Sequence, residues 1–202
     1  MTKSLTKGER TRLRLLEAAE RIFGEHGFHS ASVTDITREA EVANGTFYVY
    51  FPSKADLLCE LVRTRGHEMR AQLRLATEGM TDRAEAEQAG MLAFLDWVRS
   101  HPHIYRIVKN AEFVDGDVFQ EWYRRLGEGY AEALGRSMDG GEIEPAHAEA
   151  LAYCLMAVYD FAGMRWVLWE DREEIPDDVL ATITGFVLRG LGIEEGRRAS
   201  RA

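Results

Sequence analysis

The chain has 202 residues, is 46% apolar and carries a formal net charge of −9. That apolar fraction is ordinary for a globular protein and too high for a disordered one. No apolar run approaches the roughly 18 residues that a membrane span needs, and no signal peptide opens the chain. The two cysteines, Cys59 and Cys154, offer no CxxC pair. We therefore expect a cytoplasmic protein with free thiols and no membrane partner.

The charge is unevenly distributed along the chain. Residues 1–54 hold 8 Lys and Arg against 7 Asp and Glu, a net charge of +1. Because the whole chain has a net charge of −9, residues 55–202 carry −10. Five basic side chains lie near the start, opposed there only by Glu9: Lys3, Lys7, Arg10, Arg12 and Arg14. A basic end on an acidic body indicates that this end meets a polyanion, and a solvated terminal tail is the alternative.

The periodicity of apolar residues predicts an all-α fold of about nine helices, with no repeats and no strands. Ser32 and Ser53 are placed to cap the second and fourth helices, and Pro145 to be the first residue of the eighth. In chain order the helices are expected at about 7–25, 32–40, 44–51, 53–78, 82–101, 102–114, 118–138, 145–170 and 177–191.

The stretch EVANGTFYVYFPSKADLL, residues 41–58, contains an unusual third helix. On a helical wheel Phe47 and Phe51 form a narrow inward stripe, whereas Val49 points almost directly away. The outer arc has no charge until Lys54, although a solvated helix face normally carries Lys and Glu. That arc consists of Asn44, Gly45, Thr46, Tyr48, Val49 and Tyr50.

An uncharged arc of small polar groups, phenols and one aliphatic side chain suits the DNA major groove. The major groove admits a helix, and it offers hydrogen-bonding base edges together with the thymine methyl group. A short aromatic helix buried between others is the alternative. The preceding helix, SVTDITREA, followed by a short turn, completes a helix-turn-helix arrangement, which favours the DNA-binding interpretation.

Residues 12–62 resemble the N-terminal DNA-binding domain of the TetR family of transcriptional regulators. The similarity rests on AAERIFGEHGF, SVTDIT, GTFYVYF and SKADLL, which occur in this order. Two positions depart from the family pattern. Glu41 stands in the turn where glycine is usual, and Ala43 stands where serine or threonine is common. Glu41 must then accept the backbone geometry of the turn, at a cost if its φ is positive.

The resemblance implies a helix-turn-helix DNA-binding domain over 1–52 and a ligand-binding and dimerisation domain over 53–192. The Arg-rich terminal sequence predicts a disordered tail over 193–202. It implies a homodimer, formed through the last two helices, on a palindromic operator of double-stranded DNA. By position, the DNA-contacting residues would be Ser32, Thr34, Asn44, Gly45, Thr46, Tyr48, Val49, Tyr50 and Lys54.

The resemblance also implies a small-molecule effector that releases a repressor from its operator. Ligand pockets are mostly apolar with a few convergent polar groups. The segments HPHIYRIVKNAEFVDGD and GMRWVLW are similar to regulators of this family that sense acyl-CoA or related metabolites, and Arg106, Lys109 and Arg165 could pair with an anionic ligand. The candidate ligand-binding residues are Trp97, Tyr105, Asn110, Phe113, Trp122, Tyr123, Tyr130, Tyr153 and Arg165.

Two other classes of protein compete with this interpretation. An enzyme is disfavoured because no GxSxG, P-loop or CxxC pattern appears, and His101 and His103 lack a third ligand at metal spacing. We therefore expect no catalytic residue, no metal and no cofactor. A helical protein-interaction module without DNA binding would instead carry charge on the outer face of residues 44–50, and that face has none.

Overall fold

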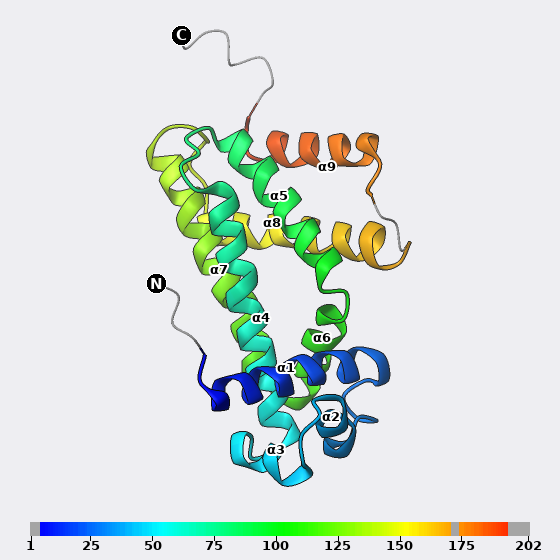
Figure 1. Cartoon of the computed structure of the whole chain (residues 1–202). Coiled ribbons are helices and arrows are strands. Elements are labelled where there is room, and N and C mark those ends of the chain that lie inside the picture. Colours follow the sequence, from blue (N-terminus) through cyan, green and yellow to red (C-terminus); the bar gives the residue numbers. More distant parts are fainter. Residues whose placement is uncertain (1–4, 171–173, 194–202) are drawn as a thin grey trace. The chain divides into compact units, whose positions relative to one another are not determined.

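A computed structural model shows the chain, and it describes residues 5–170 and 174–193. All regular elements in these two ranges are helical, which confirms the predicted all-α class (Figure 1). The predicted tail lies outside the described residues except for Ile193. The elements are α1 (Lys7–His26), α2 (Val33–Glu39), α3 (Asn44–Tyr50), α4 (Lys54–Thr77), α5 (Arg83–Ser100), α6 (Ile104–Val114), α7 (Gly116–Asp139), α8 (Ala148–Ala162), the π-helical turn η1 (Gly163–Leu168) and α9 (Asp177–Gly190).

Three helix starts differ from the sequence expectation. Helix α6 begins at Ile104 instead of Pro102, and side chains cap α7 and α8 elsewhere than expected. Helix α8 begins at Ala148 instead of Pro145, since Nδ1 of His147 accepts a hydrogen bond from the amide of Ala150 at 3.3 Å. Helix α7 begins at Gly116, since the carboxylate of Asp115 accepts from the amide of Val118 at 3.1 Å. The helix predicted over 145–170 ends as an α-helix at Ala162 and continues as η1.

The chain divides into two compact units. Unit 1 contains the described residues up to His67 together with His101–Tyr123, and unit 2 contains Glu68–Ser100 and the described residues from Arg124 onward. Helices α4 and α7 contribute residues to both units. The predicted division into domains at 52/53 stays a prediction.

Unit 1 is built around an apolar core to which α1, α4 and α6 contribute fully buried side chains such as Leu15, Leu57 and Ile107. Gly24 is required where α1 meets α6, because a Cβ there would lie 2.1 Å from Cγ of His103. Nη1 of Arg106 also donates to the carbonyl of Gly24 at 3.1 Å. Helix α6 is therefore joined to the end of α1 by both packing and a hydrogen bond.

Unit 2 contains a buried polar cluster on α5, α7 and α8. The carboxylate of Glu87, which is 3% exposed, accepts hydrogen bonds from the hydroxyl of Tyr159 at 2.7 Å and from the hydroxyl of Tyr130. Arg83, one helical turn earlier on α5, forms an ion pair with Glu87. A buried carboxylate is costly unless it is paired and hydrogen-bonded, so these partners are what allow Glu87 to lie inside the unit.

The segment Ala148–Leu168 is long and apolar enough to cross a membrane by length and composition alone. By this criterion the expectation that no segment approaches a membrane span is wrong. The apolarity has a local cause, because one face of α8 packs into unit 2. The side chains buried there are Ala152, Leu155, Met156, Tyr159 and Ala162. A core helix satisfies the same criterion, so the segment is weak support for a membrane span.

The Glu87 cluster predicts a loss of stability at alkaline pH. Burial and the neighbouring carboxylate of Glu87 raise the pKa of both Tyr130 and Tyr159 above the ordinary value. Because the folded state holds these protons more tightly than the unfolded state, their contribution is complete below about pH 10 and is lost as the pH rises further. Tyr159→Phe should therefore flatten the alkaline limb of the unfolding free energy measured by urea titration.

At pH 7 the same variant should be destabilised by about 1–3 kcal/mol, because the Glu87 carboxylate loses one buried partner. Tyr153→Phe is the matched control, since Tyr153 is exposed on the same helix. An equal alkaline limb in wild type and Tyr159→Phe would show that the cluster does not govern the pH response.

Candidate nucleic-acid interface

Helix α2 begins at a capping box that uses Ser32. The hydroxyl of Ser32 accepts from the amide of Asp35 at 3.1 Å, and the Asp35 carboxylate accepts from the amide and the hydroxyl of Ser32 at 3.2 and 2.5 Å. These hydrogen bonds lower the pKa of Asp35. The Ser32 hydroxyl, a predicted DNA contact, is thus also the cap that starts the helix.

Helix α3 has the two faces that the helical wheel predicts. Phe47 and Phe51 are 0% and 2% exposed, whereas Tyr48 and Val49 are 62% and 76% exposed. The predicted burial of the phenylalanines and the outward direction of Val49 are confirmed. The Phe47 ring packs against Phe51 with centroids 5.8 Å apart. Burial of this pair holds one side of the helix inward and leaves the uncharged arc outside.

The exposed arc of α3 can approach a groove closely. Asn44 and Gly45 are exposed and Thr46 is half-buried. A Cβ placed on Gly45 would have no heavy atom within 4 Å apart from its neighbours, so the surface there is open. An aliphatic side chain such as Val49 can contact a thymine methyl group, and hydroxyl groups can reach phosphates. We call the arc formed by Asn44, Gly45, Thr46, Tyr48, Val49 and Tyr50 the α3 outer face.

Tyr50, also a predicted DNA contact, is half-buried at the end of this helix. Its hydroxyl lies 3.6 Å from where a Cβ on Gly8 would be, so the phenol contacts the first turn of α1. The predicted phosphate contact of Tyr50 would therefore lie next to the basic start of α1.

The turn between α2 and α3 depends on an unusual backbone conformation. Glu41 has φ of 52°, and it is the non-glycine residue with positive φ among the described residues. Nη2 of Arg14 donates to the carbonyl of Ala40 and to that of Glu41, the latter at 3.2 Å. The Glu41 carboxylate lies 3.4 Å from the same nitrogen. Arg14 thus binds the carbonyls at the end of α2 and stabilises the strained turn.

Lys54 has an internal role besides its predicted contact with the DNA backbone. Its Nζ donates to the carbonyls of Phe28 and Ala31, at 2.5 and 2.6 Å, and lies 4.4 Å from the centroid of the Phe28 ring. Desolvation lowers the pKa of Lys54. Two of its three N–H donors therefore hold the loop before α2, so Lys54→Ala would disturb this loop as well as any phosphate contact.

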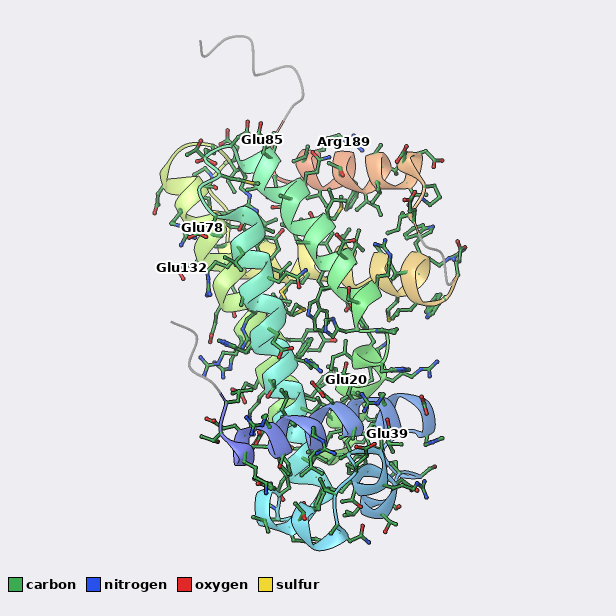
Figure 2. All side chains as sticks on the ribbon, in the orientation of Figure 1. Glu20, Glu39, Glu78, Glu85, Glu132 and Arg189 are labelled. Carbon is green, nitrogen blue, oxygen red and sulfur yellow. The ribbon has the colours of Figure 1, made fainter. Side chains whose placement is uncertain are left out.

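Other basic residues of the N-terminal helix are used inside unit 1. Arg12 forms an ion pair with Glu60 on α4, and Nε of Arg21 lies 2.6 Å from Oε1 of Glu39 at the end of α2. On the same helix Glu20 accepts from Nε of Arg65 at 2.6 Å. Figure 2 shows Glu20 and Glu39 on neighbouring helices of the unit.

Sequence reasoning missed one cation beside the interface. Arg38, in the last turn of α2, has a side chain that is 74% exposed and that pairs with Asp35 at 2.8 Å. A lone basic residue at the end of the helix before the turn was the available signal. Its guanidinium offsets the Asp35 carboxylate, which would otherwise repel phosphates near Ser32.

The candidate ligand-binding residues fall into both units. Unit 2 contains Trp97, which is 1% exposed, Tyr130 of the Glu87 cluster, exposed Tyr153, and Arg165, which pairs with Glu170. Unit 1 contains Tyr105, Asn110, Phe113, Trp122 and Tyr123. Phe113 is 81% exposed, and Nδ2 of Asn110 donates to the carbonyl of Arg106 at 2.6 Å. The sequence did not indicate the other polar members of the cluster around Tyr130, which are Glu87, Arg83 and Tyr159.

Among the described residues, no group of three or more His, Cys, Asp or Glu side chains could hold a metal ion. The thiols of Cys59 and Cys154 are free. Burial and a hydrogen bond to Asp115 raise the pKa of Cys59 to about 11, so its thiol is protonated and unreactive at neutral pH.

A short helix with one buried aromatic side and one exposed uncharged side follows a capped helix and a tight turn. This arrangement is that of a helix-turn-helix DNA-binding protein. Residues 15–61 match the family described as "Bacterial regulatory proteins, tetR family". The matched segment runs from α1 into α4, so the chain contains an N-terminal DNA-binding domain of the TetR family of transcriptional regulators.

The whole chain is similar to other regulators. It is 26% identical over 189 residues to the HTH-type transcriptional activator FasR of Mycolicibacterium smegmatis, which covers 93% of this chain and 85% of that protein. The structure of the fatty acid degradation regulator FadR from Bacillus halodurans matches with a TM-score of 0.80 at 20% identity, over 95% of this chain and 100% of that one. Salmonella enterica GusR matches equally, with a TM-score of 0.80 at 20% identity over 94% and 100%.

The turn at Glu41 allows the effect of backbone strain on stability to be separated from the effect of charge. Glu41→Gly should stabilise the protein by about 1 kcal/mol in urea unfolding, because glycine tolerates positive φ and the strain of roughly 1–2 kcal/mol exceeds its entropic cost. Glu41→Gln keeps the strain and removes only the charge, so it should leave stability unchanged. If Glu41→Gly were the less stable variant, the contacts from Arg14 would already have removed the strain.

Proposed function

We propose that the chain is a cytoplasmic repressor that binds a palindromic operator as a homodimer and is released by a small-molecule inducer. The observation that carries the DNA contact is the α3 outer face, which exposes Tyr48 and Val49 and carries no charge. Base edges and methyl groups in the major groove would bind this face. Lysine and arginine contacts to phosphates would make the binding salt-dependent.

The dimer is supported by exposed aromatic side chains in unit 2. Phe161 and Trp169 are 57% and 61% exposed and their rings meet edge to face, with centroids 5.8 Å apart. Phe186 on α9 is 59% exposed. Large apolar side chains exposed on the surface mark interaction sites. In a homodimer, α8 and α9 of a second copy would cover them. A two-fold dimer requires two half-sites in the DNA.

The inducer would act through the helices that belong to both units. Helix α4 begins beside the helix-turn-helix segment and ends in unit 2, so it offers a continuous route from a ligand to α3. A ligand that favours the non-binding state by 1–3 kcal/mol would lower the affinity for DNA about 5- to 150-fold. The separation of the two α3 helices in the dimer would differ between the two states.

The ligand class that we propose is an acyl-CoA or a related fatty-acid metabolite. The structural similarity to a fatty acid degradation regulator, and to a putative fatty acid metabolism regulator of Clostridium perfringens, supports this class. GusR has the same TM-score as FadR, so the fold by itself does not select the ligand. In unit 2, Trp97 and Tyr130 would contribute apolar surface to a ligand-binding site, and Arg165 would pair with an anionic group.

Operator binding and induction can be tested with the full-length protein and a randomised duplex library. Selection should enrich a palindromic sequence, and binding to it should weaken steeply between 50 and 200 mM salt. Palmitoyl-CoA should release the DNA in a gel-shift assay, whereas free CoA should not. Enrichment of a palindrome that palmitoyl-CoA does not release from the protein would contradict the ligand class. Repression would be contradicted if a reporter gene behind this palindrome were transcribed more when the protein binds.

The proposed dimer face predicts a clear effect of charge. Phe161→Glu together with Phe186→Glu should give a monomer in analytical ultracentrifugation, because two carboxylates on each copy would face apolar side chains. Phe113→Glu is the control, since Phe113 is 81% exposed in unit 1 and should leave the oligomeric state unchanged. A dimer that persists in the double variant would place the interface elsewhere.

A further inference from the structure

Asn44, the first residue of α3, reaches back to α2 with both halves of its side-chain amide. Its Nδ2 donates to the hydroxyl oxygen of Thr34 at 3.2 Å. Its Oδ1 accepts from the hydroxyl of Thr37, which is 1% exposed. The hydroxyl oxygen of Thr37 also lies 3.0 Å from the carbonyl oxygen of Val33. The amide therefore bridges an exposed and a buried hydroxyl of α2.

This arrangement conflicts with a reading of bases by Asn44. Asparagine recognises adenine through both of its amide groups at once, one donating and one accepting. In this chain both groups are engaged with threonines of α2. A base contact would require both hydrogen bonds to break, and it would leave the buried hydroxyl of Thr37 without this partner. The predicted groove contact of Asn44 is therefore disfavoured by its own structure.

The hydrogen bond to Thr34 has a consequence for phosphate recognition. Phosphate oxygens only accept hydrogen bonds, so a threonine hydroxyl must donate its proton to contact one. Because Asn44 donates to the oxygen of Thr34, it occupies a lone pair and leaves the proton of that hydroxyl available. Thr34 is exposed at the start of α2, where a phosphate contact is predicted.

We infer that Asn44 is a positioning residue, not a base-reading residue. It orients the Thr34 hydroxyl to donate to a DNA phosphate, and the buried Thr37 hydroxyl holds the amide in the orientation that this requires. Its contribution to binding is therefore independent of DNA sequence and depends on Thr34. The inference rests on the DNA-binding function of the chain and does not require any particular effector or oligomeric state.

A double-variant cycle on the selected duplex tests this dependence. Affinities of full-length wild type, Thr34→Val, Asn44→Ala and the double variant are measured by fluorescence anisotropy. Loss of a hydrogen bond to a charged group should weaken binding on the order of 10-fold in Thr34→Val. Asn44→Ala should lose a similar factor, and the double variant should lose little more than either single one. Losses that multiply would overturn the coupling.

The sequence preference of the variants separates positioning from base readout. A fresh selection with Asn44→Ala should enrich the same motif as wild type, since a phosphate contact weakens binding uniformly across sequences. Relaxed preference at one base pair in each half-site would overturn the inference, as would the absence of any enriched motif with wild type.

Two further variants control for folding and charge. Thr34 is exposed, so Thr34→Val should keep the thermal stability of wild type, and in that background Asn44→Ala should have little effect on affinity. Thr77→Val at the end of α4 is the matched loss of a hydroxyl outside unit 1 and should bind DNA normally. Asn44→Asp should bind worse than Asn44→Ala, because its carboxylate would accept the Thr34 proton. Equal binding of the two would contradict the proton assignment.

Discussion

The burial of Phe47 and Phe51 is the constraint on which the DNA-binding surface depends. Helix α3 has only seven residues, too few to be stable alone, so tertiary contacts must hold it. With both rings almost fully buried, the rotation of the helix about its axis is fixed. Val49 and Tyr48 are then exposed by geometry. The outer face of α3 can therefore lack charge, because the buried pair of rings and not surface ion pairs keeps the helix in place.

Polar side chains outside α2 and α3, together with Asn44, hold the loop before α2, the turn after it and the start of α3. Arg14 binds the carbonyls at the end of α2, Lys54 binds those of the loop before it, and Asn44 joins α3 to α2. Basic residues that would conventionally be assigned to phosphates thus have structural partners. The acidic side chain of Glu41, near the DNA face, is offset by the same guanidinium that stabilises its turn.

Local patterns predicted the helices, the buried phenylalanines and the exposed Val49, because each follows from periodicity. The resemblance to the family, which usually has glycine in this turn, directed attention to the backbone of Glu41. The partners of Lys54 and Arg14 could not be predicted, since backbone carbonyls have no sequence signature and these lie 23 or more residues away. Arg83 and Glu87 resemble an ordinary surface pair at i and i+4, and only the packing of α7 and α8 buries them. The assignments of ligand-binding residues stay predictions.

The central claim is that the uncharged outer face of α3 enters the groove of DNA. Fluorescence anisotropy of the selected duplex with Val49→Glu tests it most directly, with Leu75→Glu as the control, because both side chains are exposed, at 76% and 67%. A carboxylate among base edges should be repelled by the flanking phosphates and lower the affinity at least about 100-fold, while the control binds as wild type. Equal affinities of the two variants and wild type would contradict the account.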